Sequence, residues 1–241
     1  MKDLIRSEAL KLKTTRGALW LLLGAVAINV FAVVAPGENA IRDFARPLAE
    51  QQSWFIVTTL MRILLLVLGI RAITEEFRHG TITPTLLATP DRTRVVSAKA
   101  VAVSAAGGII AVVATLAWLG SMAMVAELNM VTIHPIAESW RSLAGMALAG
   151  TAWPVVGLGV GLLVRSQAGA IVGGIVWLMA LEEMLAGRLG DLGGFLPGRA
   201  GLLAALAPTG RALWLGAVSL LAYAVLAMVA GWASLDRRDI A

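Results

Sequence analysis

The side chains that could act as nucleophiles, metal ligands or phosphate-binding groups are few in this sequence and lie apart from one another. The two histidines, His79 and His134, belong to no His-Glu-x-x-His motif, and no serine lies in a Gly-x-Ser-x-Gly motif. No glycine-rich segment ends in the Gly-Lys-Ser/Thr of a phosphate-binding loop. The chain has no cysteine, which excludes disulfides and thiolate chemistry. We therefore expect no catalytic, metal-binding or cofactor-binding residue in this chain.

Three charged residues fall inside long apolar segments. Arg62 lies about eight residues into one such segment, and Glu182 and Glu183 lie near the end of another. A charge at the centre of a bilayer costs about 2.5–3.5 kcal/mol, so such residues usually face a protein interior or a watery cavity, often as pairs. At ~1.5 Å per residue, Arg62 and the two glutamates reach similar depths from opposite faces, which makes an ion pair geometrically feasible. The alternatives are that Arg62 snorkels and that the apolar segment ends near Leu181.

The longest polar interruption between apolar segments runs from Glu75 to Lys99. Thr83 is a candidate N-cap, Pro84 suits the first helical position, and Pro90 would end the helix after about two turns. Asp91 is then expected to cap a second helix that continues into the next apolar segment. The pattern therefore predicts a charged loop that presents a short helix.

This loop resembles the first cytoplasmic loop of ABC-2 type transporter permeases, which carries a coupling helix. The resemblance implies that residues 83–88 dock on a separate ATP-binding subunit and transmit its movements to the membrane helices. The alternative is a basic loop that only fixes the membrane topology. The residues to which the resemblance assigns coupling are the following members of the loop: Glu75, Glu76, Arg78, Gly80, Thr81, Pro84, Leu86, Leu87, Pro90 and Arg92.

The composition is that of a membrane protein. Of 241 residues, 59% are hydrophobic and 15% are charged, and the mean hydropathy of +0.82 is too high for an ordinary soluble domain of this size. The net charge of +5 would suit nucleic acid in a soluble protein, but the basic residues here flank apolar segments and are better interpreted as topology signals. We therefore expect a lipid bilayer as a partner and no nucleic acid.

Six apolar segments are long enough to cross ~30 Å of hydrocarbon, which predicts an all-α, polytopic membrane protein with one transmembrane permease domain over residues 1–241. The first is long enough, at about nineteen residues, to be a retained anchor and not a cleaved signal peptide. The spans are expected at about 17–35, 54–73, 98–125, 143–164, 168–185 and 212–235.

Three shorter features accompany the spans. Residues 2–13 are expected to form an amphipathic interfacial helix with a basic face toward anionic lipid; the alternative is a solvated basic tail. Residues 187–210, rich in Gly and Pro, predict a re-entrant or interfacial segment between the fifth and sixth spans, where ABC-2 exporters also have short helices. The small residues at 157–161 and 169–173 predict close packing between the fourth and fifth spans.

The distribution of Lys and Arg predicts the orientation. Thirteen lie on the side that holds the N-terminus, the loop up to Lys99, Arg165 and the C-terminus, against six on the other side. By the positive-inside rule both termini are cytoplasmic, in a multi-pass protein of the cell membrane. The same count puts the charged loop where an ATPase could reach it.

The resemblance implies a permease subunit of an ATP-driven exporter, which is not itself an enzyme. It implies two ATP-binding subunits that hold ATP and magnesium and a second permease subunit of the same or a related chain. The sequence does not identify the substrate, but the mostly apolar spans would suit a hydrophobic or amphipathic one. Two alternatives stay open. One is an ATP-independent secondary carrier, which would need an inverted repeat that the sequence does not show. The other is a non-transporting membrane scaffold or immunity protein, which would work without an ATPase.

Overall fold

The computed structural model describes residues 1–35, 52–130, 140–206 and 209–236, and these residues form helices and short connections without a strand. Six helical segments of this described part are long and apolar enough to cross a membrane, which confirms the prediction of an all-α fold with six spans. The segments are Arg16–Val34, Val57–Arg78, Arg92–Leu128, Leu143–Val164, Gln167–Phe195 and Gly210–Leu235. Residues 36–51 between the first two spans, residues 131–139 between the third and fourth, and the charged tail after Asp236 lie outside the described residues.

The helices follow one another along the chain with short connections. Their bounds are α1 Lys2–Thr14, α2 Arg16–Val34, α4 Gln52–Arg78, α5 Ile82–Ala88, α6 Arg92–Leu128, α7 Trp140–Val164, α8 Gln167–Val176, the π-helix η3 Trp177–Leu181, α9 Glu182–Leu189, the 3-10 helix η4 Gly190–Phe195, α10 Pro197–Leu206 and α11 Gly210–Asp236.

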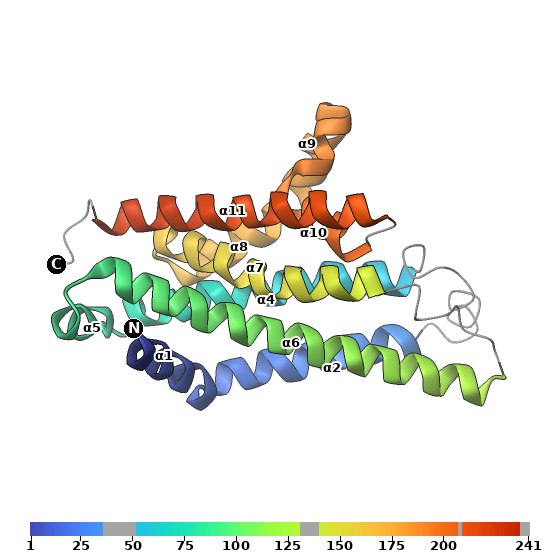
Figure 1. Ribbon diagram of the computed structural model, residues 1–241, viewed down its shortest axis with the longest axis horizontal. Helices are drawn as coiled ribbons and strands as arrows, with labels where there is room; N and C mark the ends of the chain where they lie inside the picture. Colours follow the sequence, from blue (N-terminus) through green and yellow to red (C-terminus); the bar gives the residue numbers. More distant parts are fainter. Residues whose placement is uncertain (36–51, 131–139, 207–208, 237–241) are drawn as a thin grey trace.

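The long helices α2, α4, α6, α7 and α11 lie side by side as a bundle, with α7 packed against α4, α6 and α11 (Figure 1). The N-terminus, the C-terminal end of α11 and α5 lie at the same end of this bundle. Large side chains such as Met61, Trp118, Trp153 and Leu220 fill the centre and are fully buried. Because α7 packs against three of the other four long helices, it is the central helix of the bundle.

The glycines of α7 allow this close approach, but their partners differ from the expected ones. A Cβ on Gly157 would lie 2.1 Å from the Leu66 carbonyl oxygen of α4, and one on Gly159 would lie 2.4 Å from the backbone of Ala227 in α11. Around Gly173 of α8 there is open space. The prediction that the fourth and fifth spans pack tightly on each other is therefore wrong: α7 uses its small residues against α4 and α11.

The fifth span is not one straight helix. After α8 the backbone passes through η3, and α9 then projects away from the bundle (Figure 1). A π-helix widens the turn and changes the direction of the chain, which is why the span bends there. The chain returns through η4, and α10 packs against α7 and α11. The predicted short helical segment between the last two spans is thus present, while its placement in the bilayer stays a prediction.

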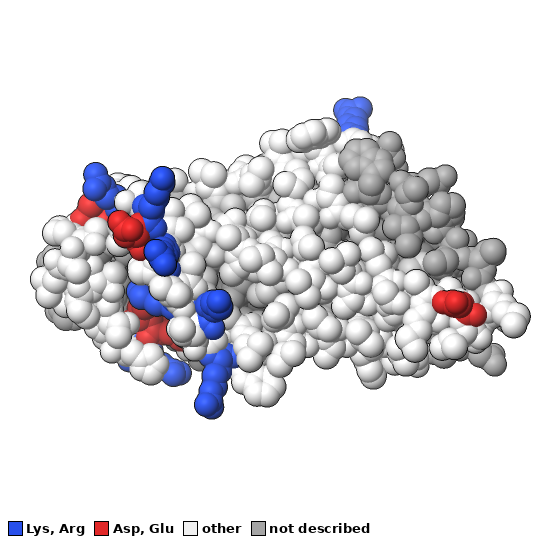
Figure 2. All heavy atoms as spheres, turned by 60° about the horizontal axis from the view of Figure 1, so that its bottom comes forward, with Lys and Arg blue, Asp and Glu red and all other residues white. Residues whose placement is uncertain are grey.

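Charged side chains gather at the end of the bundle that holds α1, α5 and the C-terminal end of α11. Figure 2 shows Lys, Arg, Asp and Glu concentrated there on the visible face, followed by a long, mostly uncharged surface with a basic side chain at its upper edge and an acidic one near the opposite end. A bundle whose middle is apolar and whose charges lie beyond it suits a bilayer, because charged groups are costly inside hydrocarbon. The helix α1 packs against α6 and α2 at the charged end, where an interfacial helix was expected.

Candidate functional site

Ile82 is the one buried side chain among the described side chains of the short helix α5. Ile82 is 4% exposed and lies in an apolar cluster with Ile73, Val96 and Leu158, whereas Leu87 is 78% exposed. The Leu86 side chain lies outside the described set. Of the other side chains of α5, Thr85 is half-buried and the rest are exposed. Ile82 was not singled out from the sequence, because nothing in a two-turn helix shows locally which residue turns inward.

The start of α5 differs from the prediction by one residue. The helix begins at Ile82 and not at Thr83, and Thr81 precedes it without a side-chain cap. Gly80, at φ +66°, turns the chain back after α4 and brings Ile82 against the core before Thr83 is reached. The next helix behaves as expected, because Asp91 caps α6: its Oδ1 accepts a hydrogen bond from the Arg94 amide at 3.1 Å.

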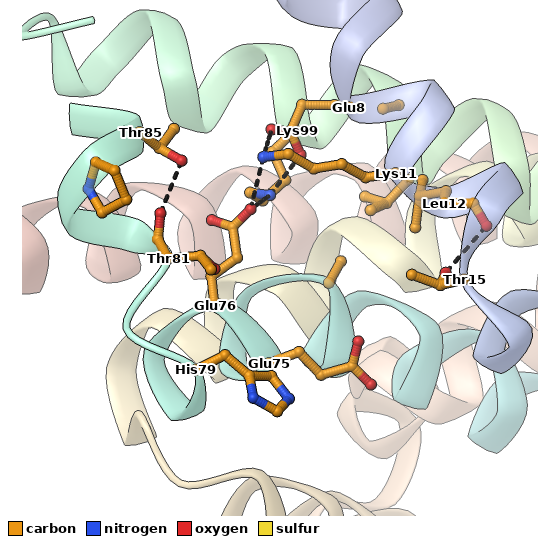
Figure 3. A pocket seen from close by; sticks show the side chains of 14 residues that line it. Glu8, Lys11, Leu12, Thr15, Glu75, Glu76, His79, Thr81, Thr85 and Lys99 are labelled. Atoms are coloured by element: carbon orange, nitrogen blue, oxygen red, sulfur yellow. Dashed lines mark hydrogen bonds and ion pairs between the residues drawn. The ribbon is translucent and has the colours of Figure 1, made fainter. Parts of the chain in front are cut away.

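Four charged side chains, Glu8, Lys11, Glu76 and Lys99, form an alternating cluster that we call the charge ring. Lys99 Nζ donates to Glu8 Oε2 at 2.5 Å and to Glu76 Oε1 at 2.9 Å. Lys11 Nζ donates to Glu8 Oε1 at 2.6 Å and also to Glu76 Oε1 at 2.9 Å. Figure 3 shows the four side chains converging from α1, α4 and α6. The ring therefore joins three helices beside α5.

Burial makes the charge ring energetically sensitive. The side chain of Lys99 is only 3% exposed, and the two glutamates are also buried. Isolated buried charges cost several kcal/mol each, but two anions and two cations in alternation compensate one another through charge-assisted hydrogen bonds. The ring also explains Glu8, which interrupts the apolar side of α1 in the sequence: it faces Lys99 in place of an apolar neighbour.

The pKa shifts of Glu8 and Lys11, the two members of the charge ring on α1, favour their charged forms. Burial alone would raise the pKa of Glu8, but the charge of Lys99 and hydrogen bonds from Lys11 and Lys99 lower it on balance. Burial alone would lower the pKa of Lys11, but hydrogen bonds to Glu8 and Glu76 raise it. Both shifts keep these groups ionised near neutral pH.

Two arginines bind the C-terminal turn of α11 at the same end of the bundle. Arg92 Nη1, at the start of α6, donates to the Leu235 carbonyl at 2.6 Å. Arg165, in the turn between α7 and α8, donates from Nη2 to the Ser234 carbonyl at 3.1 Å and lies 5.4 Å from the centre of the Phe77 ring. Cations at a helix C-terminus satisfy its last carbonyls and its dipole. These contacts link α4, α6, α7 and α11 around the site.

The residues to which coupling was assigned thus separate into two groups. Glu76 and Arg92 point into the bundle, and Glu75 is held by Arg71 through hydrogen bonds of 2.5 and 2.7 Å. Arg78 is exposed beside His79, at 3.3 Å. Gly80, Thr81, Pro84, Leu87 and Pro90 lie on the exposed surface around α5. The residues assigned to coupling therefore include some that bond within the helix bundle and some that form the exposed surface around α5.

The charges inside the spans converge on the first turn of α10. Arg62 Nη1 donates to the Gly198 carbonyl at 2.6 Å, and the Glu182 carboxylate accepts from the amides of Gly198 and Arg199 at 2.9 and 2.5 Å. A Cβ on Gly198 would lie 2.7 Å from both Glu182 oxygens. Arg62 and Glu182 are both buried, so Arg62 does not snorkel. They meet through the Gly198 backbone, and Glu183 bonds Arg199 at 2.6 Å.

Comparison with known proteins finds one family. A family model described as ABC-2 family transporter protein matches residues 4–181. The matched region contains α5, the whole charge ring and Arg62, and it ends with η3. A search of curated proteins finds no match to the chain.

Proposed function

Because the matched region covers well over half of its length, this chain belongs to the ABC-2 transporter family, and we propose that it is the permease subunit of an ATP-driven exporter whose helix α5 docks on a separate ATP-binding subunit. The chain itself would span the membrane and would not hydrolyse ATP. ATP and magnesium would be held by two such partner subunits, and a second permease subunit, the same or a related chain, would complete the transporter.

The exposure of Leu87 carries this proposal. A leucine that is 78% exposed, on a two-turn helix at the charged end of the bundle, has no core of its own to enter. The spans have an apolar environment in the membrane, but α5 lies beyond the apolar surface, at the charged end. Burial of such a side chain in a partner is favourable by about 1.5–3 kcal/mol. We infer that Leu87 inserts into a cleft of the ATP-binding subunit.

The attachment of α5 supports a route for the coupled movement. Ile82 lies in one apolar cluster with residues of α4, α6, α7 and α11, so a displacement of α5 reaches four long helices through direct packing. The charge ring and the two arginines at the end of α11 join the ends of the same helices. Packed interfaces tend to have discrete arrangements, so such a push would favour a switch between two states of the bundle.

The charge distribution supports the orientation. The N-terminus, the C-terminal end of α11 and α5 lie at the same end of the bundle, which is the end rich in Lys and Arg (Figures 1 and 2). By the positive-inside rule this end faces the cytoplasm of a cell with the permease in its plasma membrane. The mostly apolar spans would suit a hydrophobic or amphipathic substrate.

The experiment is Leu87→Asp in a chain co-expressed with the ATP-binding subunit of a neighbouring gene. The variant should insert into the membrane normally, but the complex should fail to co-purify or to hydrolyse ATP. Leu128→Asp is the matched control, because Leu128 is 72% exposed at the opposite end of α6. Normal assembly and hydrolysis with Leu87→Asp would contradict the docking of α5. It would favour a carrier or scaffold that works without an ATPase.

A further inference from the structure

A cavity of about 480 Å³ lies between α5 and the charge ring. Pro84 and Thr85 of α5 form one wall, while Ala72 and Val103 line its inner part. Figure 3 shows the cavity with the charge ring on one side and Thr81 and Thr85 on the other. Its volume is within the range of small-ligand pockets. The lining combines polar and charged residues with five apolar ones, Leu12, Ala72, Pro84, Ala102 and Val103, and the cavity lies at the charged end of the bundle.

One carboxylate oxygen of this lining lacks a partner. Glu76 Oε1 accepts from both Lys11 and Lys99, whereas Glu76 Oε2 is buried without a hydrogen-bond partner among the described residues. The residue is 7% exposed. A buried acceptor that is left unsatisfied is costly, and more so when it is charged. The oxygen therefore favours any cationic donor that can reach it.

The charges around the cavity balance one another. The lining has three carboxylates, those of Glu8, Glu75 and Glu76, two lysines, Lys11 and Lys99, and His79. Arg71 neutralises Glu75 from outside the lining, and the charge ring is balanced. The available acceptor is therefore Glu76 Oε2, to which a cationic group could donate a hydrogen bond without displacing either lysine. The apolar residues of the lining suit a ligand whose charge is carried at the end of an aliphatic stem.

We propose that this cavity receives a lysine or arginine side chain of the ATP-binding subunit, whose cationic end pairs with Glu76 while its stem lies against Ala72 and Val103. The inference rests on the proposed function, because the partner is the subunit that would cover Leu87. The cavity wall and Leu87 belong to the same two-turn helix, so a surface that buries Leu87 also covers the cavity. This end of the bundle is charged, whereas lipid tails require the apolar surface beyond it (Figure 2).

The side chain of the ATP-binding subunit would enter the cavity past α5. Ile82 is the buried side chain of the described part of α5, and the rest of the helix makes few contacts with the bundle. A small outward shift of α5 would open the cavity, and a seated cation would then hold the helix in one position. The pairing would thus contribute to the affinity of the partner and also fix the coupling helix relative to the charge ring.

The test compares Glu76→Gln with Glu8→Gln. Both variants remove one negative charge from the charge ring, but only Glu76→Gln removes the charged acceptor that lines the cavity without a partner. The measurement is the Kd of the purified ATP-binding subunit for the chain in nanodiscs of phosphatidylglycerol and phosphatidylcholine, which contain no primary amine. Glu76→Gln should raise Kd about tenfold or more, and Glu8→Gln should raise it much less. Equal Kd values for the two variants would overturn the inference.

A second pair of variants keeps the charge ring intact. Thr85→Lys introduces a cation on the cavity wall that should pair with Glu76 from within the chain and exclude the partner's side chain, again raising Kd about tenfold. Thr83→Lys introduces the same charge on the exposed part of α5 and should bind normally. A Thr85→Lys chain that binds as tightly as Thr83→Lys would also overturn the inference.

Leu87→Asp in the same assay separates this inference from the proposed function. Loss of binding with Leu87→Asp, together with equal Kd values for Glu76→Gln and Glu8→Gln, would leave the docking of α5 intact and exclude the cation site. Unchanged binding with Leu87→Asp would contradict the docking itself, whatever the glutamine variants do.

Discussion

Lys99 Nζ lies 2.5 Å from Glu8 Oε2, and this contact joins residues 91 positions apart in the chain. Through it the first helix is fixed to α6 at the point where α6 leaves the charged loop. The contact gives α1 a second role beside any contact with lipid, because α1 becomes part of the support for α5. Removal of any one of the four charges should therefore lower the stability of the helix ends that the charge ring joins.

Lys99→Met should destabilise the chain by about 3–5 kcal/mol, because it leaves two buried carboxylates with one lysine. Adding Glu8→Gln to Lys99→Met restores neutrality, so the double variant should lose less stability than the sum of the two single variants. The measurement is the free energy of unfolding in detergent. Lys13→Met is the control, since Lys13 is an exposed lysine of α1, the helix that carries Glu8. A loss for Lys99→Met no greater than that for Lys13→Met would exclude a stabilising charge ring.

The pKa shifts predict how this stability depends on pH. The pKa of Glu8 is lowered from 4.5, so its contribution is present above pH 4.5 and is lost as the pH falls through the lowered pKa. The pKa of Lys11 is raised from 10.5, so its contribution is present below pH 10.5 and is lost as the pH rises through the raised pKa.

The melting temperature of the native chain should therefore exceed that of Glu8→Gln by a constant amount between about pH 5.5 and 9. The difference should shrink on further acidification, because a protonated Glu8 resembles glutamine in charge. Both proteins would be melted in the same detergent and salt. An advantage that grows as the pH falls below 4.5 would show that Glu8 is stabilised in its protonated form and would contradict the ring.

Local signals in the sequence were sufficient for the spans and for some helix ends. Asp91 has the cap geometry expected from the residues around it, and six apolar helical segments lie at the expected places, although the third and fifth, Arg92–Leu128 and Gln167–Phe195, are longer than predicted. The interior of the site was not predictable in this way. The contact between Glu8 and Lys99 and the burial of Ile82 depend on which helices become neighbours, and periodicity within one helix does not contain that information.

The direction of the fifth span could not be predicted for a related reason. The alternative that this span ends near Leu181 stays a prediction; the π-helix ends at Leu181, and Glu182 begins the helix that leaves the bundle. Composition shows that a segment is long enough to span, but the hydrogen-bond pattern that bends it depends on its neighbours. The α7 glycines were likewise recognisable as a packing surface, whereas their partners, α4 and α11, were not.

The contacts around Gly198 predict a different order of stabilities for the Arg62→Ala and double variants from the order that a direct ion pair between Arg62 and Glu182 would give. For a direct pair, Arg62→Ala should cost more than the double variant with Glu182→Ala. Here Glu182 also accepts two backbone amides at the start of α10, so its removal takes away a helix cap, worth about 1 kcal/mol, together with a buried acceptor.

We therefore expect the double variant to be less stable than Arg62→Ala, as measured by thermal unfolding in detergent. Glu183→Ala is the control and should have little effect, because Glu183 is exposed and bonds only the exposed side of Arg199. A double variant more stable than Arg62→Ala would show that the charge pairing outweighs the cap.

The orientation can be tested with single cysteines, because the native chain has none. Asn39 belongs to the loop that we expect on the outer side of the membrane, but it is not among the described residues. Met130 is therefore the better reporter of the outer side, because it is 97% exposed at the end of α6 far from α5. Thr83 is exposed on α5 and Ser166 in the turn between α7 and α8, both at the charged end.

In intact cells, a membrane-impermeant maleimide should label Met130→Cys and spare Thr83→Cys and Ser166→Cys, which should react only after the membrane is opened. The charge count of thirteen against six requires this pattern under the positive-inside rule. The reverse pattern would put α5 outside the cell, out of reach of any cytoplasmic ATP-binding subunit, and the docking of Leu87 and the cation site at Glu76 would both be excluded.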